Sequence, residues 1–216
     1  METLAIYGSG GFAREVLWLI QSTLSETTQV ICFIDDNPNV QGATIHNLPV
    51  LSFADVVERF PSIKIITAIG SPDVRQKLTQ KIYESGLKVK TIIHPSTLYS
   101  EKWVSIGEGS IICAGNILTV DIQIGEQVHI NLDCTVGHDS IIGDFTTLSP
   151  GVHISGWVHL GKRVYIGTGA NIINGTPDQP LVIADDVVIG AGACVTRSIT
   201  QAGVTAVGVP AKVVNR

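Results

Sequence analysis

Residues 106–172 read IGEGSI ICAGNI LTVDIQ IGEQVH INLDCT VGHDSI IGDFTT LSPGVH ISGWVH LGKRVY IGTGAN I, and every group begins with Ile, Leu or Val. A period of six residues matches neither the 3.6-residue turn of an α-helix nor the two-residue alternation of a β-strand. It is the period of a coil of short flats, each of which turns one aliphatic side chain inward. Gly, Asn or Ser often follows the aliphatic residue, and these residues tolerate tight corners. The pattern predicts a hexapeptide-repeat parallel β-helix.

The composition fits such a coil and argues against several classes of protein. Of the 216 residues, 44% are hydrophobic and 15% are charged, which suits flats that bury a continuous aliphatic ladder. No stretch approaches the roughly 18 apolar residues of a membrane span, so no membrane insertion is expected. The net charge of -5 argues against nucleic acid as a partner.

The N-terminus and the cysteines favour a cytoplasmic protein. The first residues, METLAIYGSGG, have no basic lead and no small-residue cleavage site, so no signal peptide is expected. The cysteines lie far apart without a C-x-x-C pair, as is typical of small buried hydrophobes in a reducing compartment.

Residues 1–93 follow a different pattern, in which short apolar strands alternate with helical stripes. Such alternation predicts a parallel sheet flanked by helices, and therefore an α/β domain over 1–93 before an all-β domain over 94–216. Ser52 and Ser71 are expected to cap two of the helices. Strands are predicted over 4–7, 30–34, 65–68 and 89–93, and helices over 12–22, 51–60 and 71–84.

The segment Asn174–Pro180 interrupts the six-residue frame, which resumes out of phase at Ile183, Ile189 and Val195. We expect a loop that protrudes from one corner of the coil. It is either a tolerated surface insertion or a loop over a ligand or a subunit joint. The tail Gly208–Val214 is expected to end the coil and cap its open edge.

Gly8-Ser9-Gly10-Gly11 lies between a predicted strand and a predicted helix, where backbone N–H groups can bind phosphate. The acidic pair Asp35-Asp36 ends the second strand, where a carboxylate can bond a ribose or a base. Gly70 and Arg75 are a second candidate lip of that pocket. From these residues alone, a nucleotide site and a plain tight turn both stay open, and Arg75 is equally an exposed helix charge.

The six-residue flats, the tail Gly208-Val209-Pro210-Ala211-Lys212 and the N-terminal Gly-Ser-Gly-Gly unit together resemble the bacterial sugar acyltransferases, and within them the PglD/NeuD-like branch. The resemblance covers essentially the whole chain. It implies a Rossmann-like nucleotide-sugar-binding domain before a left-handed β-helix, assembled as a homotrimer with acetyl-CoA between neighbouring coils. Members of this branch acetylate nucleotide-linked amino sugars, or sialic acid, for surface glycans.

His138 is an outward-facing residue of its flat, and a surface histidine on a coil is more often inert. The resemblance makes it the catalytic base, with Asp139 in place of the family's Glu to orient it. The base would remove a proton from a sugar amine, so that the amine can attack the thioester directly. Asn131 would orient the base or the substrate, or would be a plain corner residue.

The resemblance also implies that acetyl-CoA contacts Gly156, Thr168 and Ala191 on successive coils, and that Thr147 replaces a second family histidine. Gly156 follows His138 by three flats, which make one full turn of the coil, so the two should stack. Its N–H would then hold the thioester oxygen as that atom gains charge. The alternative is a plain corner glycine. Phe12 stands where many relatives carry a histidine, and that hydrogen bond is expected to be missing.

His129, His153 and His159 invite comparison with zinc enzymes built on β-helices. No two of the coil histidines are separated by one full turn of three flats, and the short-spaced pair typical of those enzymes is missing. We therefore expect no metal site.

The resemblance, together with His138 and the glycine unit, implies an acetyl-CoA-dependent N-acetyltransferase for an amino-deoxysugar linked to UDP, dTDP or GDP. One alternative is an O-acetyltransferase for sialic acid or another free sugar. Another is a non-catalytic coil that acts as a scaffold or a nucleotide-sugar sensor. A serine or maltose acetyltransferase would share the coil but does not explain the Gly-Ser-Gly-Gly unit.

Overall fold

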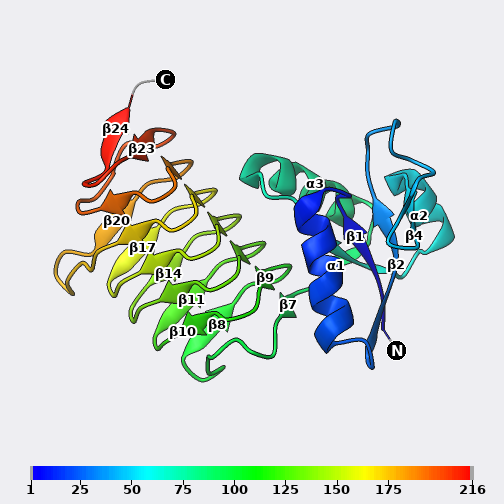
Figure 1. The fold of residues 1–216 in the computed structure, drawn as a ribbon, viewed down its shortest axis with the longest axis horizontal. Helices are drawn as coiled ribbons and strands as arrows, with labels where there is room; N and C mark the ends of the chain where they lie inside the picture. The colour runs from blue at the N-terminus through cyan, green and yellow to red at the C-terminus, as the bar shows by residue number, and fades with distance from the viewer. Residues whose placement is uncertain (1, 215–216) are drawn as a thin grey trace. The chain divides into compact units, whose positions relative to one another are not determined.

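The computed structural model describes residues 2–214, and the chain divides into two compact units (Figure 1). The first runs up to Gly70 and continues over Val74–Thr91, and the second comprises Ser71–Asp73 and the chain from Ile92 onward. In the described part of the chain, no helix is both long and apolar enough to cross a membrane.

The first unit is an α/β unit around a mostly parallel sheet with strand order β3-β4-β2-β1-β5-β6. Strand β1 lies between β2 and β5 and is buried on both faces, with Leu4–Tyr7 at most 1% exposed. Ser52 caps α2 as predicted, because its side chain accepts a hydrogen bond from the Asp55 N–H. The elements are β1 Glu2–Tyr7, α1 Gly11–Thr23, β2 Thr28–Ile34, β3 Thr44–Ile45, β4 Leu48–Leu51, α2 Phe53–Arg59, β5 Lys64–Thr67, α3 Pro72–Glu84 and β6 Lys88–Val89.

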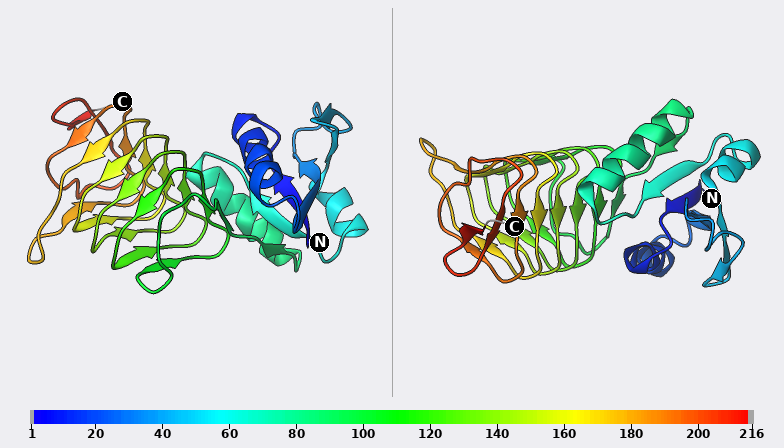
Figure 2. Two further views of the ribbon diagram at one scale, coloured as in Figure 1. Left: turned by 60° about the horizontal axis from the view of Figure 1, so that its bottom comes forward. Right: turned by 90° about the horizontal axis from the view of Figure 1, so that it is seen from above.

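The second unit is a parallel β-helix, which Figure 2 shows as a stack of similar coils. Each strand pairs with the strand one coil further on, so that Ile130 lies beside Leu148 and Ile142 beside Leu160. The strands are β7 Ile92–Ile93, β8 Val104–Ile106, β9 Ile111–Ile112, β10 Ile117–Leu118, β11 Ile122–Ile124, β12 His129–Ile130, β13 Thr135–Val136, β14 Ile141–Ile142, β15 Thr147–Leu148, β16 His153–Ile154, β17 Val158–Leu160, β18 Tyr165–Ile166, β19 Asn171–Ile172, β20 Leu181–Ile183, β21 Val188–Ile189, β22 Cys194–Val195, β23 Thr205–Val207 and β24 Lys212–Val214.

In the described residues, the strands of the coil form three sheets, and the chain visits them in a fixed order. The sheet of β8, β11 and β14 leads to the sheet of β9, β12 and β15, which leads to the sheet of β10, β13 and β16. The corner after the second of these sheets is here called the β12 corner. The corner after the third is called the β13 corner.

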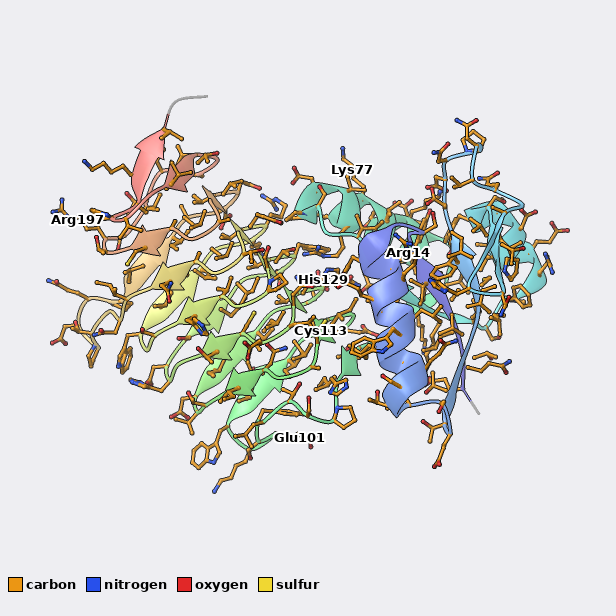
Figure 3. The ribbon with its side chains drawn as sticks, in the orientation of Figure 1. Arg14, Lys77, Glu101, Cys113, His129 and Arg197 are labelled. Atoms are coloured by element: carbon orange, nitrogen blue, oxygen red, sulfur yellow. The ribbon has the colours of Figure 1, made fainter. Side chains whose placement is uncertain are left out.

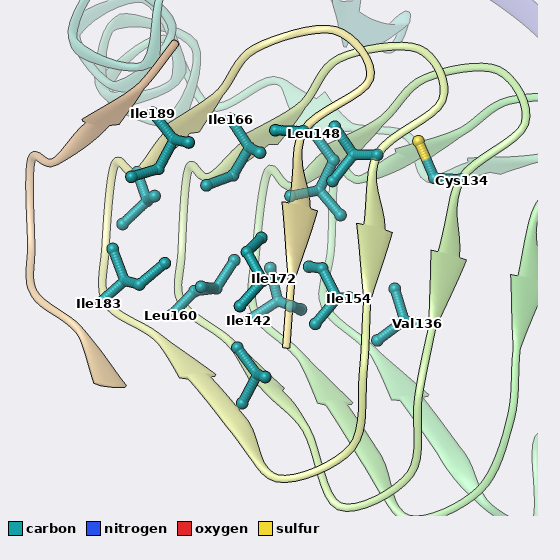
Figure 4. Packing of buried hydrophobic residues seen from close by; sticks show 14 of the residues in the cluster. Cys134, Val136, Ile142, Leu148, Ile154, Leu160, Ile166, Ile172, Ile183 and Ile189 are labelled. Atoms are coloured by element: carbon teal, nitrogen blue, oxygen red, sulfur yellow. The ribbon is translucent and has the colours of Figure 1, made fainter. Parts of the chain in front are cut away.

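The aliphatic residues of the six-residue frame point into the coil, as predicted (Figure 4). All twelve are buried except Ile106, which is partly buried in the first coil. They stack into a continuous ladder, and this ladder forms the core that holds the coils in register. Figure 4 labels Val136, Ile142, Leu148, Ile154, Leu160, Ile166 and Ile172 among them.

The predicted strand over 89–93 is two strands that belong to different sheets. The Lys90 N–H donates to the Ile65 carbonyl of the first unit, whereas the Ile92 N–H donates to the Ser110 carbonyl in the coil. The β-helix therefore begins at Ile92. A continuous apolar run gives no sign of this change of partner.

The loop and the tail are found where they were predicted. Ile142 pairs with Leu160, three flats further on, whereas Leu160 pairs with Ile183, which is a longer step along the chain. The longer step accommodates the loop over 174–180. After the coil, β24 pairs antiparallel with β23 and so covers the edge of the sheet that contains β9, β12 and β15.

We expect Gly143→Ala to lower the free energy of unfolding by about 1–3 kcal/mol, because a Cβ at Gly143 would collide with the Gly161 backbone of the next coil. Thermal or chemical unfolding measures the effect. Ser155→Ala is the control, since Ser155 stands at the same position of its hexapeptide and already carries a side chain. Equal stability of the two variants would contradict the close coil spacing.

Candidate active site

His138 lies at the β13 corner, with a side chain that is 55% exposed. Asp139 follows in the left-handed backbone conformation, at φ +57°, which an Asp tolerates better than most residues. This conformation brings the carboxylate of Asp139 back to the imidazole, and Nδ1 of His138 lies 2.7 Å from Oδ2 of Asp139. Asp139 thus orients the ring with Nδ1 as the donor, which leaves Nε2 able to accept a proton.

Gly156 lies directly against the His138 ring, one coil further on, as the spacing of three flats predicted. A Cβ on Gly156 would lie 2.5 Å from both Cε1 and Nε2 of His138. Any larger residue would displace the ring, so Gly156 is required for the position that the imidazole occupies. The Nε2 atom therefore faces the backbone of the next coil.

Trp157 is a part of this site that the sequence reasoning missed. Its indole meets the His138 ring edge to face, with 6.4 Å between the ring centroids and 85° between the planes. The backbone N–H of Trp157 donates to the His138 carbonyl at 2.9 Å. The sequence contained a signal for it, namely a change of residue type at one repeat position. Asp121 and Asp139 hold this corner position in the two preceding coils, and Trp157 is bulkier than either.

The other predicted coenzyme residues lie away from this corner. Thr168 and Ala191 lie at the β12 corner on successive coils, and the Thr168 carbonyl accepts from the Gly192 N–H. Thr147 lies in β15, buried and in register with His129 of β12. Asn131 lies at the β12 corner, where its side chain donates to the Leu148 carbonyl, and its role in orienting the base or the substrate stays a prediction.

The histidines of the coil do not converge. Among residues 2–214, no group of three or more His, Cys, Asp or Glu side chains is placed to hold a metal ion. His129 is fully buried in β12 (Figure 3), and His153 lies beside the Thr135 hydroxyl, 2.9 Å from it.

The first unit contains a cavity of about 200 Å³ at the carboxyl ends of β1, β2 and β5. Parallel α/β sheets bind ligands at this edge. The predicted residues Gly8, Asp35 and Asp36 line it. The full lining is Tyr7, Gly8, Ile34, Asp35, Asp36, Ile69, Val74 and Leu78.

The turn Gly8-Ser9-Gly10-Gly11 between β1 and α1 is held by contacts with neighbouring loops. Gly8 has φ +111°, and a Cβ there would lie 2.9 Å from the Ala68 carbonyl oxygen, so glycine is needed. The Ser9 hydroxyl donates to Asp35, whose other carboxylate oxygen accepts from the Asn37 N–H. Gly10 and Gly11 have open space around them at the start of α1, with no side-chain cap on the helix.

A hydrogen-bonded group of Tyr7, Asp36 and Lys81 lies at the cavity, and Lys81 was missed by the sequence analysis. The Tyr7 hydroxyl donates to Asp36 at 2.7 Å, and Nζ of Lys81 lies 2.9 Å from the same carboxylate. Burial, together with the hydrogen bond to Asp36, raises the pKa of Tyr7, so the phenol stays a donor. Lys81 is one helix turn from Leu78, but nothing in the sequence pairs it with Asp36.

Gly70 and Arg75 do not form the predicted lip. Arg75 is fully buried and donates to the Ile69 carbonyl at 2.7 Å, and it does not line the cavity. Burial lowers the pKa of its guanidinium to about 9. Its side chain stabilises the loop, because a buried loop carbonyl that water cannot reach needs a hydrogen-bond donor from the protein.

Comparison with known proteins places the chain in a family. The model of the PglD N-terminal domain matches residues 3–82. GDP-perosamine N-acetyltransferase of Escherichia coli O157:H7 is 32% identical over 221 residues, which cover 100% of this chain and 98% of that protein. The structure of WeeI from Acinetobacter baumannii AYE is 37% identical at a TM-score of 0.88, covering 99% of this chain and 100% of that one.

A further solved structure contains CoA together with a nucleotide-linked sugar. A histidine variant of perosamine N-acetyltransferase from Caulobacter crescentus, in complex with CoA and GDP-perosamine, is 30% identical at a TM-score of 0.88 and covers 100% of this chain and 98% of that one. The chain belongs to the PglD/NeuD-like family of sugar acetyltransferases. It is therefore an acetyltransferase that takes its acyl group from acetyl-CoA.

Gly156→Ala is expected to lower the turnover of acetyl transfer about a hundredfold, because the added methyl group displaces the imidazole. Steady-state release of CoA measures the loss, and an unfolding curve checks that the variant is folded. Ser155→Ala, one residue away, should keep its turnover. Full activity of Gly156→Ala would show that the ring position does not matter.

Proposed function

We propose that the protein is an N-acetyltransferase for a nucleotide-linked amino-deoxysugar in surface glycan biosynthesis. GDP-perosamine, named for two of its full-length relatives, is the first candidate substrate. The observation that carries the proposal is the His138 imidazole, which is bonded to Asp139 through Nδ1 and directs Nε2 over Gly156. The reaction takes place in the cytoplasm, a compartment that suits free cysteines.

In the proposed reaction, the sugar amine attacks the thioester carbonyl directly. A protonated amine is not a nucleophile, so the ammonium form first loses one proton to water. Nε2 of His138 takes a second proton from the nitrogen as it attacks, and Asp139 stabilises the imidazolium that forms. The C–N bond forms as the carbonyl oxygen gains negative charge. The C–S bond then breaks, and the departing sulfur receives the proton from His138. No covalent enzyme intermediate is needed.

The Gly156 N–H is the proposed donor to the developing oxyanion. It makes no backbone hydrogen bond within residues 2–214, and it lies next to the ring that takes the proton. A fixed N–H group in this position stabilises charge that exists only during the reaction. Gly156 would thus have two roles, one as space for the imidazole and one as a donor.

The nucleotide of the substrate is assigned to the cavity of the first unit, which we take to be Rossmann-like. The open backbone at Gly10 and Gly11, at the start of α1, suits a diphosphate. Asp35 and Asp36 line the cavity and would accept from a ribose hydroxyl or from the N–H groups of a base.

We infer that the active form is a homotrimer of left-handed coils. His138 and Gly156 lie at the β13 corner, whereas Thr168 and Ala191 lie at the β12 corner. A coenzyme that contacts both sets must lie between one copy and the next. The exposed aliphatic side chains of Ile117 and Ile141, 42% and 38% exposed, suit burial against a neighbour.

The substrate assignment is tested by pairing acetyl-CoA with GDP-, UDP- and dTDP-linked amino sugars and with free sialic acid. We expect CoA release with an amino-sugar nucleotide, and a loss of roughly 10²–10⁴ in turnover for His138→Ala. His153→Ala, which removes an exposed histidine from the next coil, should be neutral. Acetylation of sialic acid alone would support the O-acetyltransferase instead.

The shared site is tested by mixing two inactive variants. His138→Ala destroys the β13 corner and Ala191→Trp blocks the β12 corner, so mixed trimers should contain some intact sites. Co-expression should restore activity above that of either variant alone, and sedimentation should give the mass of three 23.0 kDa chains. An active monomer would exclude the trimer.

A further inference from the structure

Trp157 occupies the left-handed backbone conformation that recurs at the corners of the coil, where Phe145 at φ +61° and Arg163 at φ +56° also adopt it. Its φ is +57°, in the left-handed region, where glycine, Asn and Asp are the usual residues. Asp121 and Asp139 hold the same position one coil apart, at φ +55° and +57°. The coil therefore fixes the backbone of residue 157, and the indole that replaces the Asp of the two preceding coils determines what the side chain contacts.

The indole has a specific partner at this corner. It meets the His138 ring edge to face, at 6.4 Å between centroids and 85° between planes. The backbone N–H of Trp157 donates to the His138 carbonyl at 2.9 Å, as the backbone N–H of Asp139 donates to the Val120 carbonyl one coil earlier. Trp157 therefore contacts both the side chain and the backbone of His138, from the coil that Nε2 faces, while Asp139 holds the ring at Nδ1.

The loop over 174–180 anchors this corner in turn. It leaves the coil where the Gly175 N–H donates to the Gly156 carbonyl at 3.0 Å, and it rejoins where the Leu181 N–H donates to the Trp157 carbonyl at 2.9 Å. Thr176 and Gln179 close the loop with reciprocal backbone hydrogen bonds. The insertion is thus fastened at both ends to the two residues next to the imidazole.

We propose that Trp157 is a positioning residue for the reaction. Its indole, opposed by the Asp139 carboxylate, keeps the His138 imidazole in the orientation in which Nε2 lies over Gly156, and the loop over 174–180 holds the backbone of Gly156 and Trp157 in place. The proposal rests on the assignment of His138 as the base. A ring held from two sides needs no reorganisation when the amine arrives, which favours proton transfer.

The test compares kcat and the KM for acetyl-CoA in Trp157→Gly, Trp157→Phe and Trp157→Leu. Glycine adopts the left-handed conformation readily, so the melting temperature of Trp157→Gly should not fall, yet kcat should fall roughly 10–100-fold with KM changed less than about threefold. Trp157→Phe keeps an aromatic edge and should recover most of kcat, whereas Trp157→Leu should not. Asp121→Gly is the matched control at the same corner and conformation, and it should leave kcat unchanged.

A kcat for Trp157→Gly within threefold of the parent overturns the proposal, and so does equal turnover of the Phe and Leu variants. If Trp157→Gly does not fold, the comparison of the Phe and Leu variants decides. The His138→Ala variant separates failure of this proposal from failure of the proposed function. If only the role of Trp157 is wrong, His138→Ala is still inactive. If His138 is not the base, His138→Ala stays active.

Discussion

The rest of the site depends on the register of the coil, in which three flats make one turn. Parallel pairing of successive coils, maintained by the buried aliphatic ladder, places each residue beside its counterpart three flats further on. This register alone brings Gly156 under His138. A ladder of this kind is stiff, because each coil is packed and hydrogen-bonded on both sides, and stiffness is what a positioned base requires.

The residues at the corners of the coil vary more than the inward aliphatic residues, and the candidate catalytic residues lie at these corners. An inward position accepts little besides an aliphatic residue, whereas a corner residue projects outward and is limited mainly by its backbone conformation. The left-handed corner at Asp139 turns a carboxylate back to its neighbour. At Trp157 the same conformation directs an indole to the ring from the other side. Two side chains with one backbone geometry therefore act on a single imidazole.

The sequence predicted those parts of the structure that follow from a period. The six-residue frame predicts the coil, its loop over 174–180 and the stacking of Gly156 on His138. Strand and helix alternation predicts the sheet of the first unit, and the strand ends place Gly8, Asp35 and Asp36 at one cavity. These inferences needed only local pattern and the regular geometry of each element.

The remaining features depend on partners that are distant in the sequence. Arg75 points inward because the carbonyl of Ile69 needs a hydrogen-bond donor, and a periodic sequence pattern does not reveal this. Lys81 meets Asp36 across 45 residues. Asn131 lies seven residues before His138 but at another corner, and its role stays a prediction. The oligomeric state could not be predicted from the repeat pattern for a similar reason, since it depends on the surface of another copy.

The most direct measurement is a crystal structure of the protein with CoA and a nucleotide-linked amino sugar bound. We expect the sugar nitrogen to lie about 2.6–3.2 Å from Nε2 of His138, on the side of Gly156, with the coenzyme sulfur next to it. A sugar nitrogen or a sulfur bound far from that imidazole would contradict the assignment of the base and the mechanism built on it.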